Sequence, residues 1–470
     1  MSAAIHFDIL VIGSGPAGQK AAIQGAKAGK CVAMIEREPG VGGGCVYRGT
    51  IPSKTLRESA LRADRLQRSS TTPDTHIPPN ITVSSLMRRL DEVVASHGDY
   101  MMNQLTRNGV VLFHGRAHFC SDSLIEMLTV DGMRQTLTAD TIVIATGSRP
   151  RAPVEIPIDH EHILDSDSIL SMIYLPRSLT VLGGGIIALE YASIFAALGV
   201  QVTIIDRADR PLQFFDAELV RVFVQSFEQT GGRYCGGQAM REVRWDGISQ
   251  VVTTLQDGQV FTSDKMLVAV GRQANIEDLN LSATGLIATE KGTLAVNEHC
   301  QTAIPHIYGV GDLIGPPGLA SSAMEQGRRA VCHALGLPEG QSASAIPVGI
   351  YTIPEMSSIG LDETAGRKRY KDVMIGRAKF NEIARGQISD IRNGLLKMVA
   401  DPTGEYLLGV QIVGEGATEL IHVAQMALQY GATVDSFVEN IFNFPTLAET
   451  YRVAALDIVG QRQKRLASAA

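Results

Sequence analysis

Two glycine-rich turns, each followed by an acidic residue, are the features whose residue types and spacing most directly suggest chemistry. The first turn holds Gly13, Gly15 and Gly18, and Glu36 stands 18 residues beyond the third glycine. Glycines at this spacing permit a tight turn, a close approach of the backbone to phosphate and close packing of a helix on a strand. The unpaired N–H groups of that helix would bind a pyrophosphate, and the carboxylate would accept hydrogen bonds from both ribose hydroxyls. The pattern therefore predicts a dinucleotide site.

A second turn repeats the arrangement with Gly183, Gly185 and Asp206. A carboxylate at position 206 would bind the adenosine ribose and favour NAD over NADP, because it repels a 2′-phosphate. Arg207 and Arg210 follow at once, however, and guanidinium groups are natural partners of phosphate. The second turn therefore predicts a nicotinamide dinucleotide site, and the two arginines are interpreted either as phosphate ligands or as solvated surface.

The elements that must position these residues follow the same order in both copies. Each copy has an apolar strand, the glycine turn, a helix and a second strand that ends on the acid. The expected ranges are strands 7–12 and 31–35 around a helix that ends near 28, and strands 178–182 and 201–205 around a helix at about 187–198. The chain therefore predicts an α/β fold with two Rossmann-like units.

Between the two copies, helical periodicity at 51–67 and 84–107 flanks a Ser/Thr/Pro-rich stretch at 69–80, which is interpreted as an exposed loop. Three further elements are expected before the second copy: a strand at 110–113, a hairpin at 116–130 and a buried strand at 141–145. Residues 346–470 have no glycine fingerprint and predict a final α+β unit, in which 419–430 forms an amphipathic helix for packing or an interface.

Length and composition limit the class of protein. A chain of 470 residues is too long for one core, and usual domain sizes predict about three domains. The net charge of −7 leaves no basic stripe, which argues against nucleic acid as the main partner. Six cysteines without metal-ligand pairs or a disulfide framework fit a reducing compartment, and the histidines show no ligand spacing. Because no apolar run approaches the ~18 residues of a membrane span, we expect a cytoplasmic enzyme without metal or membrane contact.

The segment from Val41 to Lys54, VGGGCVYRGTIPSK, resembles the redox loop of the FAD-dependent pyridine nucleotide–disulfide oxidoreductases, the family of dihydrolipoyl dehydrogenase, glutathione reductase and mercuric reductase. The resemblance covers nearly the whole chain. Other segments that resemble motifs of this family are Thr146-Gly147, Gly271-Arg272 with Asn275, Tyr308 to Asp312, and Leu319 to Ala323. Together these motifs are far more specific than a single glycine fingerprint.

The resemblance implies two dinucleotide-binding domains and a C-terminal dimerisation domain. It assigns residues 1–150 and 290–345 to FAD, 151–289 to the nicotinamide nucleotide, and 346–470 to the interface of a homodimer or higher homo-oligomer. FAD is the implied cofactor, and NAD and NADP are the implied substrates. The residues expected to contact these nucleotides are Gly13, Gly15, Gly18, Glu36, Arg37, Gly42, Gly43, Gly44, Cys45, Lys54, Ala117, Thr146, Gly147, Gly183, Gly185, Glu190, Asp206, Arg207, Gly271, Arg272, Asp312 and Ala320.

Two positions depart from the family's pattern. Its disulfide reductases use two cysteines five positions apart, whereas this chain has Cys45 and Thr50, and a hydroxyl can neither form a disulfide nor leave as a thiolate. The family's C-terminal acid–base residue is a histidine before Pro-Thr, oriented by a glutamate five residues on. Here Phe444 replaces the histidine, which leaves no group that carries a proton, whereas Glu449 is retained. Both parts needed to reduce a disulfide are missing, which predicts a reaction that uses neither.

The flavin side of the site is intact by the same resemblance. Lys54 resembles the family's lysine beside flavin N5, and Glu190 resembles its partner, so that opposite charges would keep both side chains ionised in a partly desolvated place. Such an ammonium would stabilise negative charge on the reduced flavin. Lys54 and Glu190 are therefore the predicted catalytic residues, and Cys45 is interpreted as a packed thiol rather than a nucleophile.

The predicted activity is transfer of hydride from NADPH to NAD⁺ through FAD by a ping-pong route, an NAD(P)⁺ transhydrogenation without a redox disulfide. An NAD(P)H:quinone or dye reductase would use the same pocket and also need no second cysteine, and a large apolar acceptor cleft beside the interface would favour it. The intact glycine turns and the Lys54–Glu190 pair count against an inactive scaffold. Thr50 and Phe444 count against a true dihydrolipoyl dehydrogenase.

Overall fold

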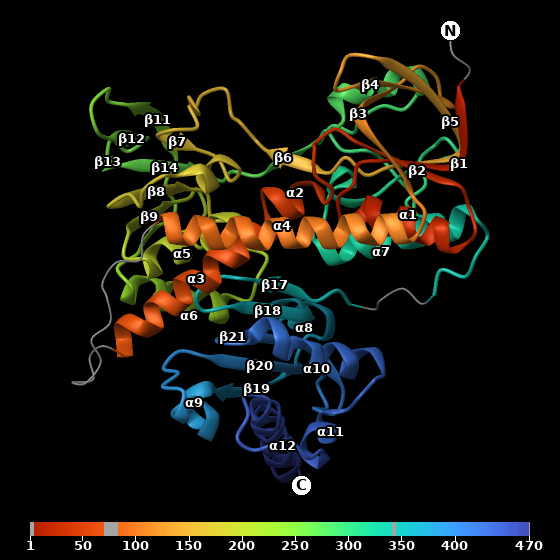
Figure 1. The fold of residues 1–470 in the computed structure, drawn as a ribbon. Coiled ribbons are helices and arrows are strands. Elements are labelled where there is room, and N and C mark those ends of the chain that lie inside the picture. The colour runs from red at the N-terminus through yellow and green to blue at the C-terminus, as the bar shows by residue number, and fades with distance from the viewer. Residues whose placement is uncertain (1–3, 70–82, 341–344, 470) are drawn as a thin grey trace.

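The computed structural model describes residues 4–69, 83–340 and 345–469. The polypeptide forms three units (Figure 1): a red-to-orange N-terminal unit and a yellow-to-green unit lie side by side, and the blue C-terminal unit lies below both. This is the α/β architecture with a separate C-terminal unit that the sequence predicts. The loop expected at 69–80 lies, apart from its first residue, outside the described residues.

The first unit is built on a parallel sheet in the order β3-β2-β1-β5-β16. Its strands are β1 (Ile5–Ile12), β2 (Val32–Glu36), β3 (Val111–Phe119), β5 (Arg134–Ile144) and β16 (Ile307–Gly309). The apolar run of β1 and the whole of β2 are buried, because helices cover both faces of a parallel sheet. β16 lies far along the chain from β5, so a late segment of the sequence returns to the N-terminal sheet.

One expectation for this unit is wrong in detail. A single strand, β3, replaces two expected elements, the strand at 110–113 and the first arm of the hairpin at 116–130. β3 pairs first in parallel with β2 and then antiparallel with β4 (Leu124–Thr129). The change of partner falls at Gly115, where a Cβ atom would lie 2.6 Å from the carbonyl oxygen of Leu128. The glycine therefore marks a close approach between neighbouring strands rather than a break between two elements.

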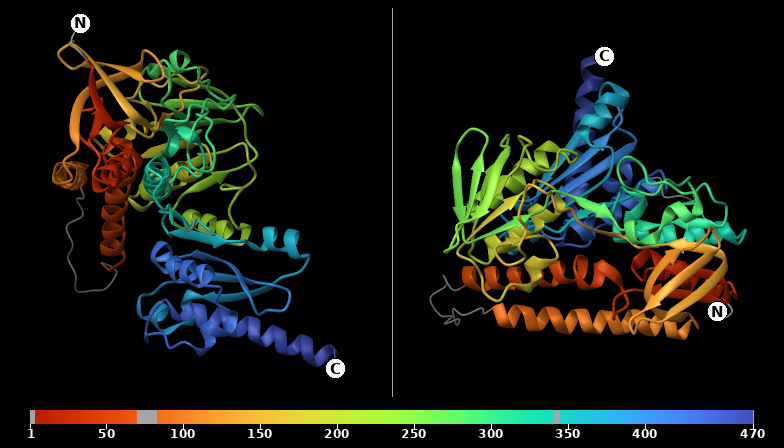
Figure 2. Two further views of the ribbon diagram at one scale, coloured as in Figure 1. Left: turned by 90° about the vertical axis from the view of Figure 1, so that its right-hand side faces the viewer. Right: turned by 90° about the horizontal axis from the view of Figure 1, so that it is seen from above.

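Helices of the first unit lie beside its sheet, and the longest of them, α4, extends past it toward the second unit (Figures 1 and 2). They are α1 (Pro16–Lys27), α2 (Gly43–Tyr47), α3 (Thr50–Ser69), α4 (Val83–Arg107) and α7 (Ala320–Ala334). α3 and α4 correspond to the two helices predicted at 51–67 and 84–107. α1 and α7 pack so closely that a Cβ atom on Gly327 would lie 2.1 Å from the carbonyl oxygen of Ala17.

The second unit repeats the plan with a parallel sheet in the order β10-β9-β8-β14-β7. These strands are β7 (Ile163–Leu164), β8 (Ser178–Leu182), β9 (Gln201–Ile205), β10 (Arg233–Cys235) and β14 (Lys265–Val268), with helices α5 (Ile186–Ala197) and α6 (Ala217–Gln229). An antiparallel meander covers the sheet: β11 (Met240–Trp245), β12 (Val251–Leu255) and β13 (Val260–Ser263). A two-stranded ladder of β6 (Ser148–Pro150) and β15 (Arg272–Ala274) links this unit to the first.

The third unit is an antiparallel sheet in the order β17-β18-β21-β20-β19. Its strands are β17 (Val348–Ile350), β18 (Met356–Gly360), β19 (Met374–Lys379), β20 (Leu395–Ala400) and β21 (Leu407–Val413), and its helices are α8 (Glu363–Tyr370), α9 (Ala384–Ile388), α10 (Ala417–Gln429), α11 (Val434–Glu439) and α12 (Glu449–Ala469). The helix expected at 419–430 is α10. Ile350 and Met356 belong to the same apolar core as α5 and Leu56 of α3, so the third unit is packed firmly against the other two.

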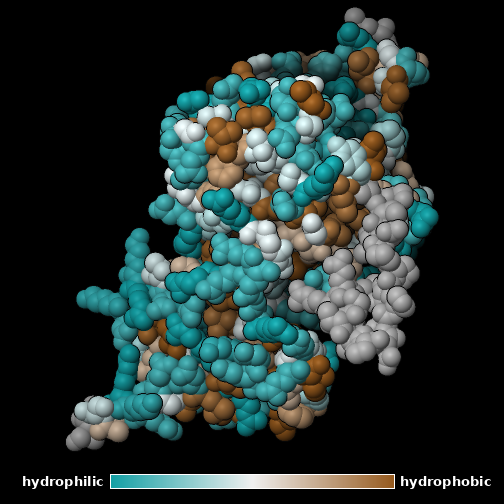
Figure 3. Space-filling view, turned by 90° about the vertical axis from the view of Figure 1, so that its left-hand side faces the viewer, coloured by the Kyte–Doolittle hydropathy of each residue, from teal (hydrophilic) through white to brown (hydrophobic). Residues whose placement is uncertain are grey.

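The outer surface is mainly polar on the face drawn in Figure 3, where hydrophobic residues form scattered groups among hydrophilic ones. Among the described residues, no helix combines the length and the apolar character that a membrane crossing requires.

Candidate nucleotide and cofactor cavity

A large cavity opens where the three units meet, with a volume of about 1810 Å³. Pockets for ordinary small ligands measure roughly 300–1,000 Å³, so this cavity has room for a long ligand or for several. The predicted site residues that line it are Gly13, Gly15, Glu36, Arg37, Gly43, Gly44, Cys45, Lys54, Ala117, Thr146, Gly147, Gly185, Glu190, Gly271, Arg272, Asp312 and Ala320. The predicted site residues that do not line it are Gly18, Gly42, Gly183, Asp206 and Arg207.

The first glycine turn has separate roles for its three glycines. Gly13 has φ +103°, and a Cβ atom there would lie 2.5 Å from the carbonyl oxygen of Ala145. A Cβ atom on Gly18 would lie 1.9 Å from the carbonyl oxygen of Gly13, whereas one on Gly15 would meet nothing within 4 Å. Gly15 precedes α1, which has no side-chain cap and no acidic residue in its first turn. The turn therefore leaves free backbone donors and open space for an anion.

Glu36, at the end of β2, is buried beside this turn. Its Oε2 accepts hydrogen bonds from the backbone N–H of Ser14 at 2.8 Å and from the Ser14 hydroxyl at 2.5 Å, and its Oε1 accepts one from the N–H of Glu38 at 2.9 Å. Each carboxylate oxygen has two acceptor positions, so Oε1 keeps one for a hydroxyl in the cavity. Arg37 lines the same part of the cavity.

Two loops meet across the first turn. Gly42 has φ +131° and precedes α2, and a Cβ atom there would lie 2.4 Å from a methyl group of Val46. Gly43 has φ +60°, and its Cβ position lies 3.0 Å from the Cα atom of Gly15. Gly42 is therefore needed for the fold of the loop, and Gly43 for the contact between this loop and the phosphate turn.

The second glycine turn is built in the same way at the start of α5. Gly183 has φ +114°, and a Cβ atom there would lie 2.5 Å from the carbonyl oxygen of Ala269, while Gly185 faces open space before an uncapped helix. Sequence reasoning missed Gly184: a Cβ atom there would lie 2.0 Å from Oδ2 of Asp206. The carboxylate of Asp206 therefore lies directly over the turn, outside the lining of the large cavity.

The two arginines beside Asp206 differ in their surroundings. Arg210 donates hydrogen bonds to the carbonyl oxygens of Phe215 at 2.9 Å and Gln213 at 3.0 Å, so it holds the loop before α6. Arg207 is exposed. Of the pair, Arg207 is therefore the better placed to meet a phosphate from solvent.

The predicted catalytic pair is formed in the cavity. Lys54 on α3 and Glu190 on α5 are 136 residues apart in sequence, and Lys54 Nζ donates a hydrogen bond of 2.7 Å to Oε2 of Glu190. The side chains are 26% and 7% exposed, so the ammonium faces the cavity while the carboxylate is enclosed. Tyr351 completes the group: its backbone N–H donates to Oε1 of Glu190 at 2.9 Å, and its ring centre lies 4.9 Å from Lys54 Nζ.

Cys45 on α2 lies at the cavity wall beside the threonine that replaces a second cysteine. Burial raises the pKa of the Cys45 thiol, and the hydrogen bond with the Thr50 side chain and the charge of Lys54 oppose that rise only in part. The thiol therefore stays protonated and is a poor nucleophile near neutral pH. This environment agrees with the interpretation of Cys45 as a packed thiol.

The remaining predicted motifs form the wall between the first two units. Thr146 donates its hydroxyl to the carbonyl oxygen of Asn275 at 2.7 Å, and the Asn275 amide donates to the carbonyl oxygen of Thr146 at 2.9 Å. Asp312 accepts a hydrogen bond from the Ser148 hydroxyl at 2.6 Å, and Ser148 accepts one from Arg272 Nε at 2.8 Å. The bonds between Thr146 and Asn275 join the two segments, and the bonds through Ser148 fix the Asp312 carboxylate at the cavity wall.

The two C-terminal positions of the family's acid–base pair, where Phe444 departs from the pattern and Glu449 keeps it, lie elsewhere in the single chain. Phe444 is 75% exposed and does not line the cavity. Glu449 begins α12, and its carboxylate accepts a hydrogen bond from the backbone N–H of Thr446 at 3.3 Å. Glu449 thus caps its own helix start.

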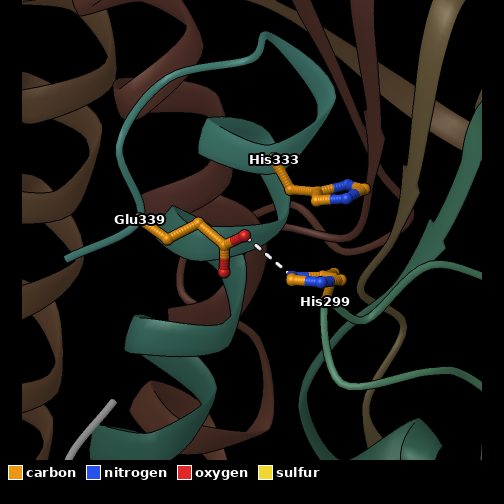
Figure 4. Close-up of side chains that lie close together, drawn as sticks. All are labelled: His299, His333 and Glu339. Atoms are coloured by element: carbon orange, nitrogen blue, oxygen red, sulfur yellow. Dashed lines mark ion pairs between the residues drawn. The ribbon is translucent and has the colours of Figure 1, made fainter. Parts of the chain in front are cut away.

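Within the described residues, one group of side chains brings together possible metal ligands that no sequence spacing revealed: His299, His333 and Glu339 (Figure 4). The two imidazole rings are stacked with centroids 4.2 Å apart and an interplanar angle of 14°. Ligands of a metal must direct their lone pairs to one point. The lone pairs of these two stacked rings lie in nearly parallel planes and do not converge in this way. Glu339 is paired with His299 at 2.7 Å and Arg329 at 2.8 Å, and Tyr308 bonds Nδ1 of His333 at 2.9 Å. The group is better explained as a set of contacts that holds α7 against the loop before β16.

Comparison with known proteins places these observations in a family. Residues 7–327 match the model described as pyridine nucleotide-disulphide oxidoreductase, and residues 346–455 match its dimerisation domain. A protein of Mycobacterium bovis BCG Pasteur named soluble pyridine nucleotide transhydrogenase is 41% identical over 97% of this chain and 98% of its own length. A protein of Aliivibrio fischeri with the same name is 40% identical over 96% of this chain and 97% of its own.

Solved structures agree with this comparison. The crystal structure of LpdA from Mycobacterium tuberculosis superimposes with a TM-score of 0.89 at 26% sequence identity, over 96% of this chain and 99% of the other. The HOCl-induced flavoprotein disulfide reductase RclA from Escherichia coli superimposes with a TM-score of 0.85 at 24% identity, over 96% of this chain and 99% of its own, and shows the same fold.

Proposed function

Because this chain belongs to the pyridine nucleotide-disulphide oxidoreductase family, we propose that it is a soluble pyridine nucleotide transhydrogenase, which moves hydride from NADPH to NAD⁺ through bound FAD. The observation that carries the proposal is the pairing of Cys45 with the Thr50 hydroxyl, in a site whose charged pair is complete. A thiol without a second sulfur cannot relay electrons to a disulfide, whereas exchange between two nucleotides needs no such relay.

The residues of the first unit fit FAD. Gly15 leaves open space beside the uncapped start of α1, which suits a pyrophosphate. The free acceptor position on Glu36 suits a ribose hydroxyl, and Asp312 presents a carboxylate further along the same cavity. FAD would therefore be held by residues 1–150 and 290–345. When bound, it supplies the hydride carrier of the reaction.

Lys54 and Glu190 would adjust the reactivity of the site rather than transfer protons. The ammonium would place a positive charge against the reduced ring, and the enclosed carboxylate would keep that charge in place. The walls from all three units would exclude water from the transferred hydride.

The second unit, residues 151–289, would bind the nicotinamide nucleotide at the start of α5. Asp206 over Gly184 suits the adenosine ribose of NAD, and the exposed Arg207 suits the 2′-phosphate of NADP. A site with both groups could admit NADPH and NAD⁺ in turn, as a ping-pong exchange requires.

Residues 346–470 would form the interface of a homodimer, because this unit contains the matched dimerisation domain. It exposes several large apolar side chains that a partner could cover: Val423, Met426, Tyr430, Ile441 and Phe444. All six cysteines are free, which supports the proposal that the enzyme works in the reducing cytoplasm.

The direct test uses the purified flavoprotein with NADPH as donor and thio-NAD⁺ as acceptor. We expect rapid formation of thio-NADH, followed by its absorbance, and no turnover of oxidised lipoamide supplied in its place. A quinone supplied as competing acceptor tests the alternative assignment. Fast quinone reduction with negligible nucleotide exchange would contradict the proposal and assign the protein to the quinone-type reductases.

A further inference from the structure

One aromatic residue of the third unit reaches the charged pair formed by the first two. Tyr351 directly follows β17, is half-buried and lines the cavity together with Lys54 and Glu190. Its backbone N–H donates to Oε1 of Glu190 at 2.9 Å, and its ring centre lies 4.9 Å from Lys54 Nζ. The unit that carries the dimerisation domain therefore also contributes to the catalytic pair.

The contacts of the Lys54 ammonium show what this ring can do. Lys54 Nζ donates a hydrogen bond of 2.7 Å to Oε2 of Glu190, and among the described residues its other hydrogen bond, at 3.4 Å, is donated to the Ser53 hydroxyl. With a side chain 26% exposed, the ammonium borders open cavity. The ring therefore gives the ammonium a second contact besides the one with the carboxylate. Attraction between an ammonium and the face of an aromatic ring grows as water is excluded.

Tyr351 is itself held in place by both neighbouring units. Arg57 of α3 is buried, and it donates to the carbonyl oxygen of Thr352 at 3.0 Å and to Glu355 at 2.9 Å. The N–H of Ile353 donates to the Ser193 hydroxyl of α5 at 3.1 Å. Burial raises the pKa of Tyr351, so its ring is neutral at ordinary pH and offers an uncharged face to the ammonium.

We propose that Tyr351 is a positioning residue for Lys54, which fixes the direction of the ammonium in the cavity through its ring face. This inference rests on the proposed function, because the direction of the ammonium affects hydride transfer only with FAD in the cavity. The role as proposed depends on the aromatic face and not on the phenolic hydroxyl, which forms a hydrogen bond with the Thr418 side chain.

The test compares Tyr351→Leu with Tyr351→Phe in the purified flavoprotein. We expect Tyr351→Leu to slow single-turnover flavin reduction by NADPH about three- to tenfold, as loss of a partly desolvated cation–π contact predicts, and to change the flavin absorbance spectrum. Phe keeps the ring face and should restore both readouts. Tyr174→Leu is the matched control, because Tyr174 makes a cation–π contact with Lys265 at 4.8 Å and does not line the cavity.

A double-mutant cycle separates positioning from loss of structure. If Tyr351 acts through Lys54, Tyr351→Leu should have no further effect on the reduction rate in a Lys54→Met background. Equal slowing in both backgrounds, or equal slowing by Leu and Phe, would overturn the inference. Failure of the proposed function is a different result, in which the unmodified protein binds FAD but does not pass hydride from NADPH to thio-NAD⁺.

Discussion

A buried lysine joins the second unit to the third, and its removal gives a quantitative prediction. Lys397 of β20 is 3% exposed, and its Nζ lies 2.9 Å from Asp216, 3.0 Å from Glu218 and 2.8 Å from Glu363. Arg377 also binds Glu218, at 2.9 Å. Asp216 is the N-cap of α6 in the second unit, and the cluster therefore fixes that helix against the C-terminal sheet.

Lys397→Met leaves three carboxylates close together, with Asp216 only 4% exposed. Breaking a buried ion pair by removing one partner costs about 3–5 kcal/mol. Asp216 keeps its bonds from the backbone N–H groups of Glu218 at 2.9 Å and Leu219 at 3.3 Å, so we expect the lower end, about 3 kcal/mol. Arg367→Met is the matched control, because Arg367 pairs with Glu363 at the surface, and such pairs contribute about 1 kcal/mol or less.

The cluster also predicts how stability depends on pH. The hydrogen bond from Arg377, and then that from Lys397, lower the pKa of Glu218 from its ordinary 4.5 to about 2. A lowered folded-state pKa stabilises the fold above the unfolded value, and this contribution is lost as the pH falls from about 4.5 to about 2. After allowance for partial exposure it amounts to about 1–2 kcal/mol. Lys397→Met removes part of the cause, so the acid loss should be smaller.

Urea unfolding of the flavoprotein, followed by circular dichroism and by flavin fluorescence, measures both effects. The experiment compares the free energy of unfolding at neutral pH and at pH values between 4.5 and 2. A Lys397→Met protein within about 1 kcal/mol of the unmodified protein, or no less stable than Arg367→Met, would refute the reasoning. It would mean that the cluster contributes no more than a surface pair.

Three further predictions concern the cavity. Thr50→Cys should allow a disulfide with Cys45, so that reductive titration takes up one further electron pair per flavin; an unchanged titration would show that the two side chains are too far apart. Gly15→Val should abolish FAD binding and leave a folded apoprotein by circular dichroism, because a Cβ atom there meets nothing, whereas Gly18→Val should not fold. Arg207→Gln should raise the KM for NADPH about tenfold with little change in the KM for NADH, and a KM for NADPH equal to that of the unmodified protein would show that Arg207 is only surface.

Much of the fold could be predicted because its signals are local. The strands and helices around each glycine turn follow from apolar runs and glycine spacing, and β1, β2, β8 and β9 occur where they were expected. β3 corresponds to two expected elements, a strand and the first arm of a hairpin, because the sequence does not show that one strand changes its pairing partner at Gly115. Only the structure shows that it permits a close approach to Leu128. The stacking of His299 on His333 also could not be predicted from the sequence, because those residues are 34 positions apart and form no motif.

The proposed catalytic pair shows that sequence reasoning has the same limit in the site itself. The contact between Lys54 and Glu190 could be predicted from a resemblance because the two side chains carry opposite charges. Tyr351 acts on Glu190 through a backbone N–H, which every residue except proline has, and on Lys54 through a ring face, which has no preferred spacing. Each of the three units therefore contributes one residue to the cluster formed by Lys54, Glu190 and Tyr351. A change in the packing of the C-terminal unit should then alter hydride transfer even when no residue that contacts a nucleotide is changed.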